Sequence, residues 1–433
     1  MRMMRALFKD IDYTILFEIM SDSLQPKCQY LCVYRHEFAQ SPSRAQARRS
    51  WPTTSTPPLP TSNAPNHARP PPDLNNTTAP AATMAPPKTS RPLKKDVFPT
   101  TFKGIKTAVL AETGRPSGLA PNIRSLSWSP TGNAIATSIS SYIRVWNPER
   151  PNVKSTTELR AGGTAMVEKV AFCPTQEAVL ASTGGEGMCR LWDVRVAGGG
   201  SVGAGKGSKL AECKTGDTGL FLSWHPSGSS CLVGRKDDAV MAVDVRKMET
   251  GEGVGWVAEA RDSSPVKDRG QFNAMAFSNS GRELFATTGE GPVKVLDWPS
   301  LELLYTLSAH TSATYAVQHS PAGSYVAVGG SDSMVTLWDT TYWHCARTIT
   351  PHMGSVRDLS FSFDGAYIAA SSGSDARDSS SGIEVSHVDT GDHVHTIETT
   401  NAVTWLAWHP LRYWLAYAGD PGGLRIVGAG TNV

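Results

Sequence analysis

The sequence predicts an all-β fold, a seven-bladed β-propeller that follows a disordered N-terminal extension. The first observation is a repeated unit, because the same order of short apolar strands and polar turns recurs seven times after residue 100. The second is its period: the anchoring positions lie 42 to 53 residues apart, as in four-stranded propeller blades. The third is composition, since 39 Gly, 29 Pro and 12 Trp suit many short strands joined by tight turns.

The first strand of each unit ends at a large side chain, and a polar turn follows. The stretches "LSWSPTG" (126–132) and "LSWHPSG" (222–228) are typical. Their alternating apolar residues predict a half-buried strand, and Ser-Pro-x-Gly or His-Pro-x-Gly supplies the turn. The seven anchoring residues are Trp128, Phe172, Trp224, Phe277, His319, Phe361 and Trp408.

The third strand of several units ends in Trp-Asp or a variant of it, as in "MCRLWD" and "MVTLWD". We also expect His310 and Asp332 to form a hydrogen-bonded brace with Trp338 inside one blade. Because such residues recur at repeat positions, they predict a structural role, and we expect no catalytic residues, no enzyme activity and no cofactor. The Trp-Asp positions are Trp146, Trp192, Asp193, Trp338 and Asp339.

A four-stranded unit with this ending is similar to a WD40 repeat. Three stretches further resemble the WD-repeat subunit of the THO complex: "LSWHPSGSSCLVGRKDDAVMAVDVR", "IEVSHVDTGDHVHTIET" and "TWLAWHPLRYWLAYAGD". The resemblance covers residues 101–433 and includes a sixth blade without Trp-Asp. It does not cover the N-terminal extension or the Gly-rich segment after Arg195.

The resemblance implies a nuclear, non-enzymatic scaffold subunit of the THO complex within TREX, which couples transcription to messenger ribonucleoprotein assembly and mRNA export. It implies large helical THO subunits as partners, with messenger ribonucleoprotein contacted indirectly. No small-molecule substrate and no membrane are expected.

Charge and cysteine content agree with this class of protein. Residues 1–100 carry 13 Lys and Arg against seven Asp and Glu, whereas residues 101–433 carry 28 against 32. The propeller therefore lacks the basic surface that tight nucleic-acid binding needs.

The sequence contains no run of 18 apolar residues, so it predicts no membrane span. Seven scattered Cys indicate reduced thiols, and the group Cys28, Cys32 and His36 lacks a fourth metal ligand.

Residues 1–100 predict a disordered Pro/Ser/Thr-rich extension, and residues 101–433 the propeller. Thirteen of the 29 prolines lie in 51–100, and such a segment buries too little apolar surface to order itself. Met84 is a plausible native start, which leaves open whether residues 1–83 are expressed. The basic stretch "KTSRPLKK" is interpreted as a solvated tail, with nuclear entry or RNA contact as the alternative.

The last unit lacks a fourth strand, and "FKGIKTAVLAE" (102–112) precedes the first unit. An open sheet edge favours aggregation, so we expect 102–112 to pair with the last blade as its outer strand.

The segment 200–207, "GSVGAGKG", resembles a phosphate-binding loop, but Gly207 stands where Ser or Thr should bind magnesium. A helix should also follow, whereas "KLAECK" reads as an outer strand, so we predict a loop and no nucleotide. Segments 247–255, 261–270 and 371–382 are predicted insertions between strands. The Ser-rich 371–381 stretch could be phosphorylated, with a solvated loop as the alternative.

The residue four positions before each anchoring residue is expected near the end of the loop that enters the inner strand, and binding in a propeller is expected on loops and rims. Arginine and tyrosine are common energetic anchors of interfaces. Among these positions, Arg124, Tyr315 and Arg357 are therefore the predicted partner-binding residues, with ordinary solvated surface as the alternative.

Two other binding functions remain open. "WDVR", Trp192 to Arg195, resembles the W-D-x-R box of substrate receptors of cullin–RING ubiquitin ligases. A generic histone- or peptide-binding propeller is a further alternative.

Overall fold

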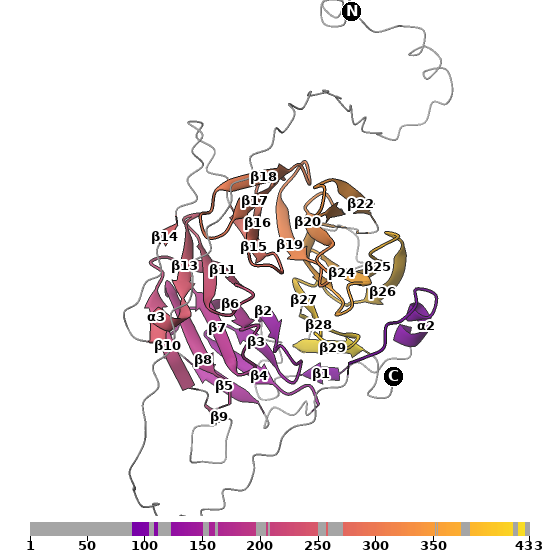
Figure 1. The fold of residues 1–433 in the computed structure, drawn as a ribbon. Coiled ribbons are helices and arrows are strands. Elements are labelled where there is room, and N and C mark those ends of the chain that lie inside the picture. The colour runs from indigo at the N-terminus through magenta and orange to yellow at the C-terminus, as the bar shows by residue number, and fades with distance from the viewer. Residues whose placement is uncertain are drawn as a thin grey trace, which may run out of the picture. The chain divides into compact units, whose positions relative to one another are not determined.

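The computed structural model describes residues 89–103, 108–110, 123–149, 156–160, 163–195, 205–206, 208–249, 257–258, 272–350, 352, 354–373, 382–418 and 423–428. Within these residues the strands form seven sheets around one axis (Figure 1). The predicted seven-bladed propeller is thus confirmed. No helix in the described ranges is long and apolar enough to span a membrane.

Each blade is an antiparallel sheet whose strands follow one another in chain order outward from the axis. Two blades differ: blade 1 has an additional fifth strand, which pairs parallel, and the outer strand of blade 7 comes from a segment that precedes blade 1 in the chain. Blade 1 contains β2 (Ile123–Trp128), β3 (Ile135–Ile139), β4 (Tyr142–Trp146), β5 (Thr157–Arg160) and β9 (Gly205–Lys206). Blade 2 contains β6 (Val167–Phe172), β7 (Val179–Gly184), β8 (Met188–Asp193) and β10 (Ser208–Lys214). Blade 3 contains β11 (Gly219–Trp224), β12 (Ser230–Arg235), β13 (Val240–Asp244) and β14 (Val257–Ala258), with helix α3 (Val245–Glu249) after β13.

The remaining blades follow the same order. Blade 4 contains β15 (Phe272–Phe277), β16 (Glu283–Thr288), β17 (Val293–Asp297) and β18 (Leu303–Leu307). Blade 5 contains β19 (Thr314–His319), β20 (Tyr325–Gly330), β21 (Val335–Asp339) and β22 (Cys345–Ile349). Blade 6 contains β23 (Val356–Phe361), β24 (Tyr367–Ser372), β25 (Gly382–His387) and β26 (His393–Glu398). Blade 7 contains β27 (Trp405–Trp408), β28 (Trp414–Ala418), β29 (Leu424–Gly428) and β1 (Ala108–Leu110).

The ring is closed by a strand from before the first blade. Strand β1 pairs antiparallel with β29, with Ala108 opposite Ile426 and Leu110 opposite Leu424. The expectation that the 102–112 segment supplies the outer strand of the last blade is confirmed. The strand is shorter than the segment, because Phe102 and Lys103 belong to helix α2 (Phe98–Lys103).

The segment 89–103, here called the strap, is part of the folded structure, so the boundary predicted at residue 100 is wrong. Phe98 is fully buried, and its ring centroid lies 4.1 Å from that of Tyr367 and 4.9 Å from that of Phe102. The Tyr413 hydroxyl accepts a hydrogen bond from the Leu93 amide at 3.0 Å, and Tyr367 donates to the Leu93 carbonyl at 2.8 Å. The disordered extension predicted up to residue 100 is therefore wrong for 89–100, since Phe98 and Leu93 bind aromatic residues of blades 6 and 7.

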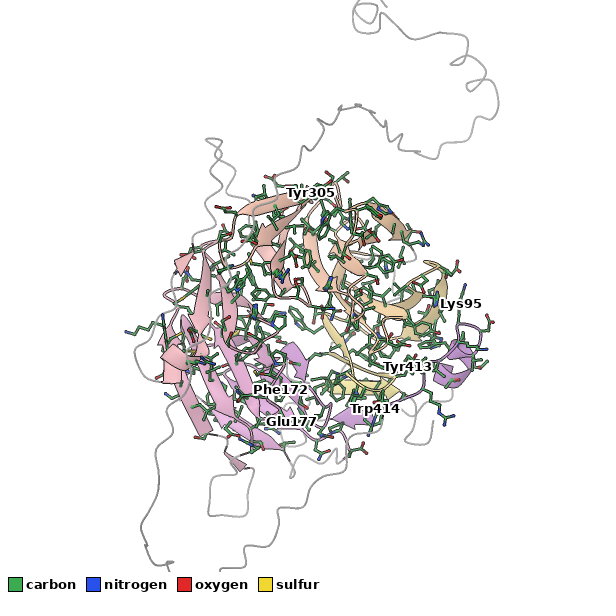
Figure 2. All side chains as sticks on the ribbon, viewed as in Figure 1. Lys95, Phe172, Glu177, Tyr305, Tyr413 and Trp414 are labelled. Atoms are coloured by element: carbon green, nitrogen blue, oxygen red, sulfur yellow. The ribbon has the colours of Figure 1, made fainter. Side chains whose placement is uncertain are left out.

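The basic stretch before α2 is also held by the propeller rather than extended into solvent. Lys95 forms an ion pair with Asp392 of blade 6, and Figure 2 shows Lys95 and Tyr413 beside α2. The interpretation of this stretch as a wholly solvated tail is therefore wrong for its last residues.

Neighbouring sheets share no ladder, and side chains link most inner strands to the next blade. The Ser127 hydroxyl accepts the Phe172 amide at 3.0 Å, and the Ser360 hydroxyl accepts the Trp408 amide at 3.1 Å. Trp128 donates its indole N–H to the Ala407 carbonyl at 3.0 Å, which joins the first blade to the last. The ring is thus held by polar contacts as well as by its apolar layers.

The turn glycines carry a second inter-blade contact. Gly132 has φ of 75°, a conformation that favours glycine, and His409 of blade 7 packs against it. His225 repeats this contact on Gly281, where its Nε2 lies 3.1 Å from the glycine carbonyl oxygen. The two His-Pro turns therefore serve as packing contacts between neighbouring blades.

We expect His409 to make the fold acid-sensitive. Burial, helped by the Arg412 charge, lowers the pKa of His409 from 6.5 to about 3, although a Gly132 backbone hydrogen bond opposes the shift. The unfolded chain takes up this proton below pH 6.5 and the folded chain does not, so stability is lost as pH falls from about 6.5 toward 3. At pH 5 the loss from this group is about 2 kcal/mol.

Urea unfolding of the wild type and of His409→Gln at pH 7.5 and pH 5 measures this loss. The wild type should lose about 2 kcal/mol more than the variant between the two pH values. His225→Gln is the matched control, because His225 occupies the equivalent turn of blade 3 but is only half-buried. An equal pH effect in the wild type and His409→Gln would contradict the expectation.

The Gly-rich segment leads into a strand, as predicted. Ser208–Lys214 forms β10, the outer strand of blade 2, where a phosphate-binding loop would need a helix. Gly205–Lys206 pairs parallel with β5 of blade 1. Part of the predicted insertion at 247–255 is helical, because α3 extends to Glu249. Most of the three predicted insertions, including the proposed phosphorylation loop beyond Gly373, lie outside the described residues.

Candidate partner-binding site

The three predicted partner-binding residues occupy the same position in their blades. Arg124, Tyr315 and Arg357 are each the second residue of an inner strand, β2, β19 and β23, and each is half-buried. In six blades the pairing register shifts between the first residue of the inner strand and the next paired residue. A β-bulge redirects the side chain that it carries and is common beside functional sites. We call these second residues the bulge positions: Arg124, Glu168, Leu220, Asn273, Tyr315 and Arg357.

Two of the predicted residues contact each other. The Arg357 guanidinium carbon lies 4.3 Å from the centroid of the Tyr315 ring, a cation–π contact between blades 5 and 6. The Gly373 backbone packs on the same arginine, since a Cβ at Gly373 would lie 3.0 Å from the Arg357 Nε. The Arg357 side chain is therefore positioned from both sides.

Arg124 has a different neighbour. Its Nη1 lies 2.8 Å from Oε2 of Glu168, the bulge residue of blade 2. About two-fifths of the Arg124 side chain remains exposed (39%), so this ion pair contributes little to stability. The pair instead fixes where the exposed guanidinium lies.

Three further residues lie nearer the axis, and the sequence analysis missed them. Lys169 and Asp358 are the third residues of β6 and β23, and Trp405 is the first residue of β27. The Lys169 ammonium lies 3.3 Å from the Trp405 ring centroid. We call Lys169, Asp358 and Trp405 the axial cluster.

The axial cluster had a detectable signal in the repeat alignment. Three positions before the anchoring residue, five blades carry a residue without charge: Ser125, Phe221, Ala274, Ala316 and Trp405. Only Lys169 and Asp358 are charged at this position, and their charges are opposite.

Burial shifts both charged groups of the axial cluster. It lowers the pKa of Lys169 to about 8, while the Asp358 and Glu168 carboxylates act in the other direction. It raises the pKa of Asp358 to about 6, opposed by the Lys169 charge and by hydrogen bonds from two backbone amides. Those amides, of Leu406 and Leu359, lie 2.9 and 3.0 Å from the Asp358 carboxylate oxygens. Asp358 therefore links blade 6 to blade 7 while facing Lys169 of blade 2.

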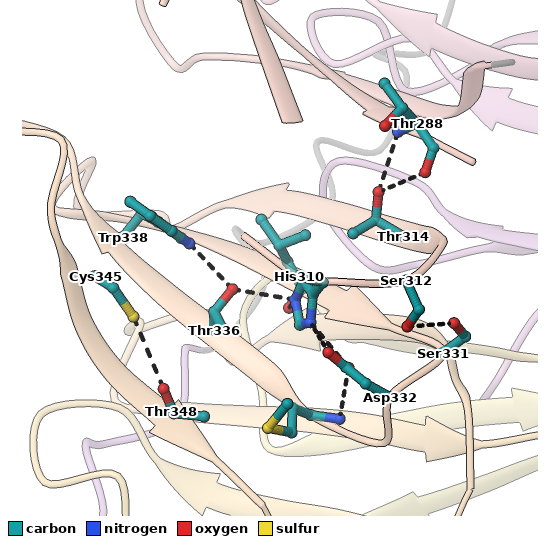
Figure 3. A network of polar contacts seen from close by, with 12 residues as sticks. Thr288, His310, Ser312, Thr314, Ser331, Asp332, Thr336, Trp338, Cys345 and Thr348 are labelled. Atoms are coloured by element: carbon teal, nitrogen blue, oxygen red, sulfur yellow. Dashed lines mark hydrogen bonds and ion pairs between the residues drawn. The ribbon is translucent and has the colours of Figure 1, made fainter. Parts of the chain in front are cut away.

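The residues of the predicted brace lie together in blade 5 (Figure 3). His310 Nδ1 donates to the Asp332 carboxylate at 2.9 Å, and its Nε2 lies 3.2 Å from the Val328 carbonyl oxygen. The Thr336 hydroxyl lies 3.2 Å from that Nε2 and accepts the Trp338 indole N–H at 3.1 Å. Thr336, which the sequence analysis did not single out, is therefore the link between His310 and Trp338.

The other structural residues also make local bonds. Trp146 donates its indole N–H to the Thr137 hydroxyl at 3.1 Å, and Trp192 donates to the Ser182 hydroxyl at 2.8 Å. Asp339 accepts the Thr341 amide at 2.9 Å. Asp193 accepts the Arg195 amide and forms an ion pair with its guanidinium at 3.2 Å. Arg195 itself is largely exposed (75% of the side chain), whereas Trp192 of the same Trp-Asp-x-Arg stretch is buried.

The described ranges contain no group of three or more His, Cys, Asp or Glu that could hold a metal ion. The group Cys28, Cys32 and His36 lies outside them. Of the cysteines within them, four are buried and Cys345 is exposed.

Comparison with known proteins places the fold in a family. The model of the WD domain, G-beta repeat, matches residues 117–147, 301–339 and 343–378. THO complex subunit 3 of Arabidopsis thaliana is 32% identical over 308 residues, 70% of this chain and 88% of that protein. WD repeat-containing protein AAC3 of Dictyostelium discoideum is 29% identical over 316 residues, 68% of this chain and 61% of that protein. The solved propeller of Cps50 (Swd1) from Myceliophteria thermophila has a TM-score of 0.61 at 17% identity and covers 75% of this chain and all of the solved one; it supports the fold alone.

Proposed function

Because this chain belongs to the THO complex subunit 3 family of WD40-repeat proteins, we propose that it is a non-catalytic scaffold subunit of a nuclear THO assembly. Its role there is to couple transcription to messenger ribonucleoprotein assembly and mRNA export, as part of TREX. It does so through protein–protein contacts with large helical subunits, and it reaches the messenger ribonucleoprotein through them. The observation that carries the proposal is the similarity to a THO subunit over 88% of that subunit's length.

The architecture supports a scaffold. Polar side chains and turn contacts join neighbouring blades, so the disc presents its bulge positions from a rigid frame. The acidic balance of residues 101–433 supports indirect rather than direct contact with RNA. The hydrogen bond of the buried His310 to Asp332 supports a structural rather than an acid–base role for this pair.

Affinity purification of the tagged full chain from nuclear extract, followed by mass spectrometry, tests the assignment. THO subunits should co-purify in near-stoichiometric amounts. Recovery of a cullin adaptor without THO subunits would replace the proposal with a ubiquitin-ligase receptor, for which the exposed Arg195 is the supporting observation. Recovery of histones alone would favour a generic peptide-binding propeller.

The same purification tests the bulge positions. The double variant Arg124→Gln and Arg357→Gln should recover several-fold less partner, because arginine anchors at interfaces contribute about 2 kcal/mol or more. Glutamine avoids placing a second carboxylate beside Glu168. The matched control is Arg282→Gln, an exposed arginine in the turn at the opposite end of blade 4's inner strand. Equal recovery with both variants, at unchanged circular dichroism, would remove Arg124 and Arg357 from the interface.

A further inference from the structure

Strand β18 is the outer strand of blade 4 and lies at the outside of the ring (Figure 1). Among the residues that the structure describes, no further strand pairs with its outer edge. Its residues Leu303, Leu304 and Tyr305 are 48%, 56% and 46% exposed, and Figure 2 shows Tyr305 at the outside of blade 4. Consecutive exposed apolar side chains on an open sheet edge favour pairing with another strand.

No charged side chain protects this edge. Charges on an edge strand are a common device against pairing with other chains. Tyr305 and Arg347 are each the third residue of the outer strand in their blade, so blade 5 has a charge where blade 4 has an aromatic ring. Every other described outer strand of four or more residues is charged: Glu158 and Arg160 in β5, Lys209, Glu212 and Lys214 in β10, Arg347 in β22, and Glu398 in β26.

The Tyr305 ring is held in place by the next blade. Trp343 of blade 5 stacks on it, with ring centroids 6.3 Å apart and an interplanar angle of 24°. Trp343 has φ of 55°, a conformation that favours glycine, and the equivalent turn residue of blade 6 is Gly391. A ring that is already positioned loses little conformational freedom when a second surface covers it.

The molecule shows that an outer strand of this propeller can accept a further strand. Strand β9 pairs with the outer edge of β5 and extends blade 1 to five strands. The chain itself also contains an uncharged apolar strand that fits the open edge of blade 4, namely β18 of a second copy.

The sequence around Tyr305 suits antiparallel pairing with itself. In a pair related by a twofold axis through Tyr305, each Tyr305 lies opposite its counterpart and each Leu304 lies opposite Thr306 of the second copy. Glu302, the nearest charged residue before the strand, then lies opposite Ser308. Like charges directly opposite each other destabilise a strand pair, and this register has none.

We propose that two copies of the full chain associate through β18, paired antiparallel about Tyr305. Such an interface uses the same edge on both copies, so it closes at a dimer. A strand of five residues is much smaller than the roughly 20–30 residues a side of a standard interface. We therefore expect a reversible dimer with a dissociation constant of about 10–100 µM. The inference does not depend on membership of a THO assembly.

Sedimentation equilibrium of the purified full chain, at concentrations on both sides of this constant, tests the dimer. The weight-average mass should rise from 46.4 kDa toward twice that value. Tyr305→Lys and Tyr305→Glu should each weaken association about tenfold or more, because each places like charges opposite each other at the twofold axis. An equimolar mixture of the two variants should restore it, since Lys then faces Glu. Thr348→Lys, at an exposed position of β22, is the matched control and should associate as the wild type does.

The proposal is overturned if the wild-type chain stays monomeric at all these concentrations, a result that does not depend on how any variant folds. It is also overturned if Tyr305→Lys associates as strongly as the wild type, or if the mixture associates no better than either variant alone. A monomeric chain whose Tyr305→Lys variant no longer co-purifies with THO subunits would assign β18 to a partner's strand instead of a second copy. Loss of THO co-purification from the wild type would reject the proposed function and leave the dimer unaffected.

Discussion

Phe98→Ala is expected to lower the free energy of unfolding by about 3–5 kcal/mol, because truncating a buried aromatic ring loses its transfer free energy and leaves a cavity. Phe98 is fully buried, stacks on Tyr367 and contacts Tyr413 edge-on. The loss is a large part of the stability of an ordinary domain. Urea unfolding followed by tryptophan fluorescence measures it.

Val97→Ala is the matched control, since Val97 precedes Phe98 in the strap but is 46% exposed. It should change the free energy of unfolding by less than about 0.5 kcal/mol. If Phe98→Ala cost no more than Val97→Ala, the strap would contribute nothing to the stability of blades 6 and 7.

Gly132→Ala is expected to cost about 3 kcal/mol or more, for two separate reasons. Its φ of 75° costs an L-residue about 1–2 kcal/mol. The new Cβ would also lie 2.0 Å from His409 Nε2, so the imidazole must move within a packed joint between blades 7 and 1. Urea unfolding again provides the measurement.

Two variants separate these reasons. Gly323→Ala has the same backbone cost, with φ of 76°, but its nearest neighbour would be 3.5 Å away, so it should cost only about 1–2 kcal/mol. In a His409→Ala background, Gly132→Ala should cost no more than Gly323→Ala does. If the cost of Gly132→Ala were unchanged in that background, the contact with His409 would not be its cause.

The repeat pattern predicted the blades because each unit is locally encoded. The turn glycines at 132, 228, 281, 323 and 365 all have positive φ, as Ser-Pro-x-Gly and its variants require. Closure by residues near 108 was also predictable, since the last unit lacked one strand.

The strap could not be predicted in the same way. Phe98 lies in a Pro-rich stretch without strand or helix periodicity, and the strap is ordered by tyrosines distant in sequence. Tyr367, whose hydroxyl contacts the Leu93 carbonyl, is 274 residues beyond Leu93. No local rule connects such partners. The axial cluster is not encoded by the repeat pattern, because Lys169 and Asp358 differ from the equivalent residues of the other blades in charge, whereas the pattern is one of strands and turns.

The double closure, by β1 and by the strap, bears on how the protein is synthesised. Leu93 and Tyr413 are 320 residues apart, so the ribosome needs about 15–60 s after making one to make the other. During that interval the finished blades form an open arc, and each end blade lacks the neighbour against which its apolar face packs in the closed ring. A chain that terminates before blade 7 cannot complete the ring, because β1 then has no β29 with which to pair.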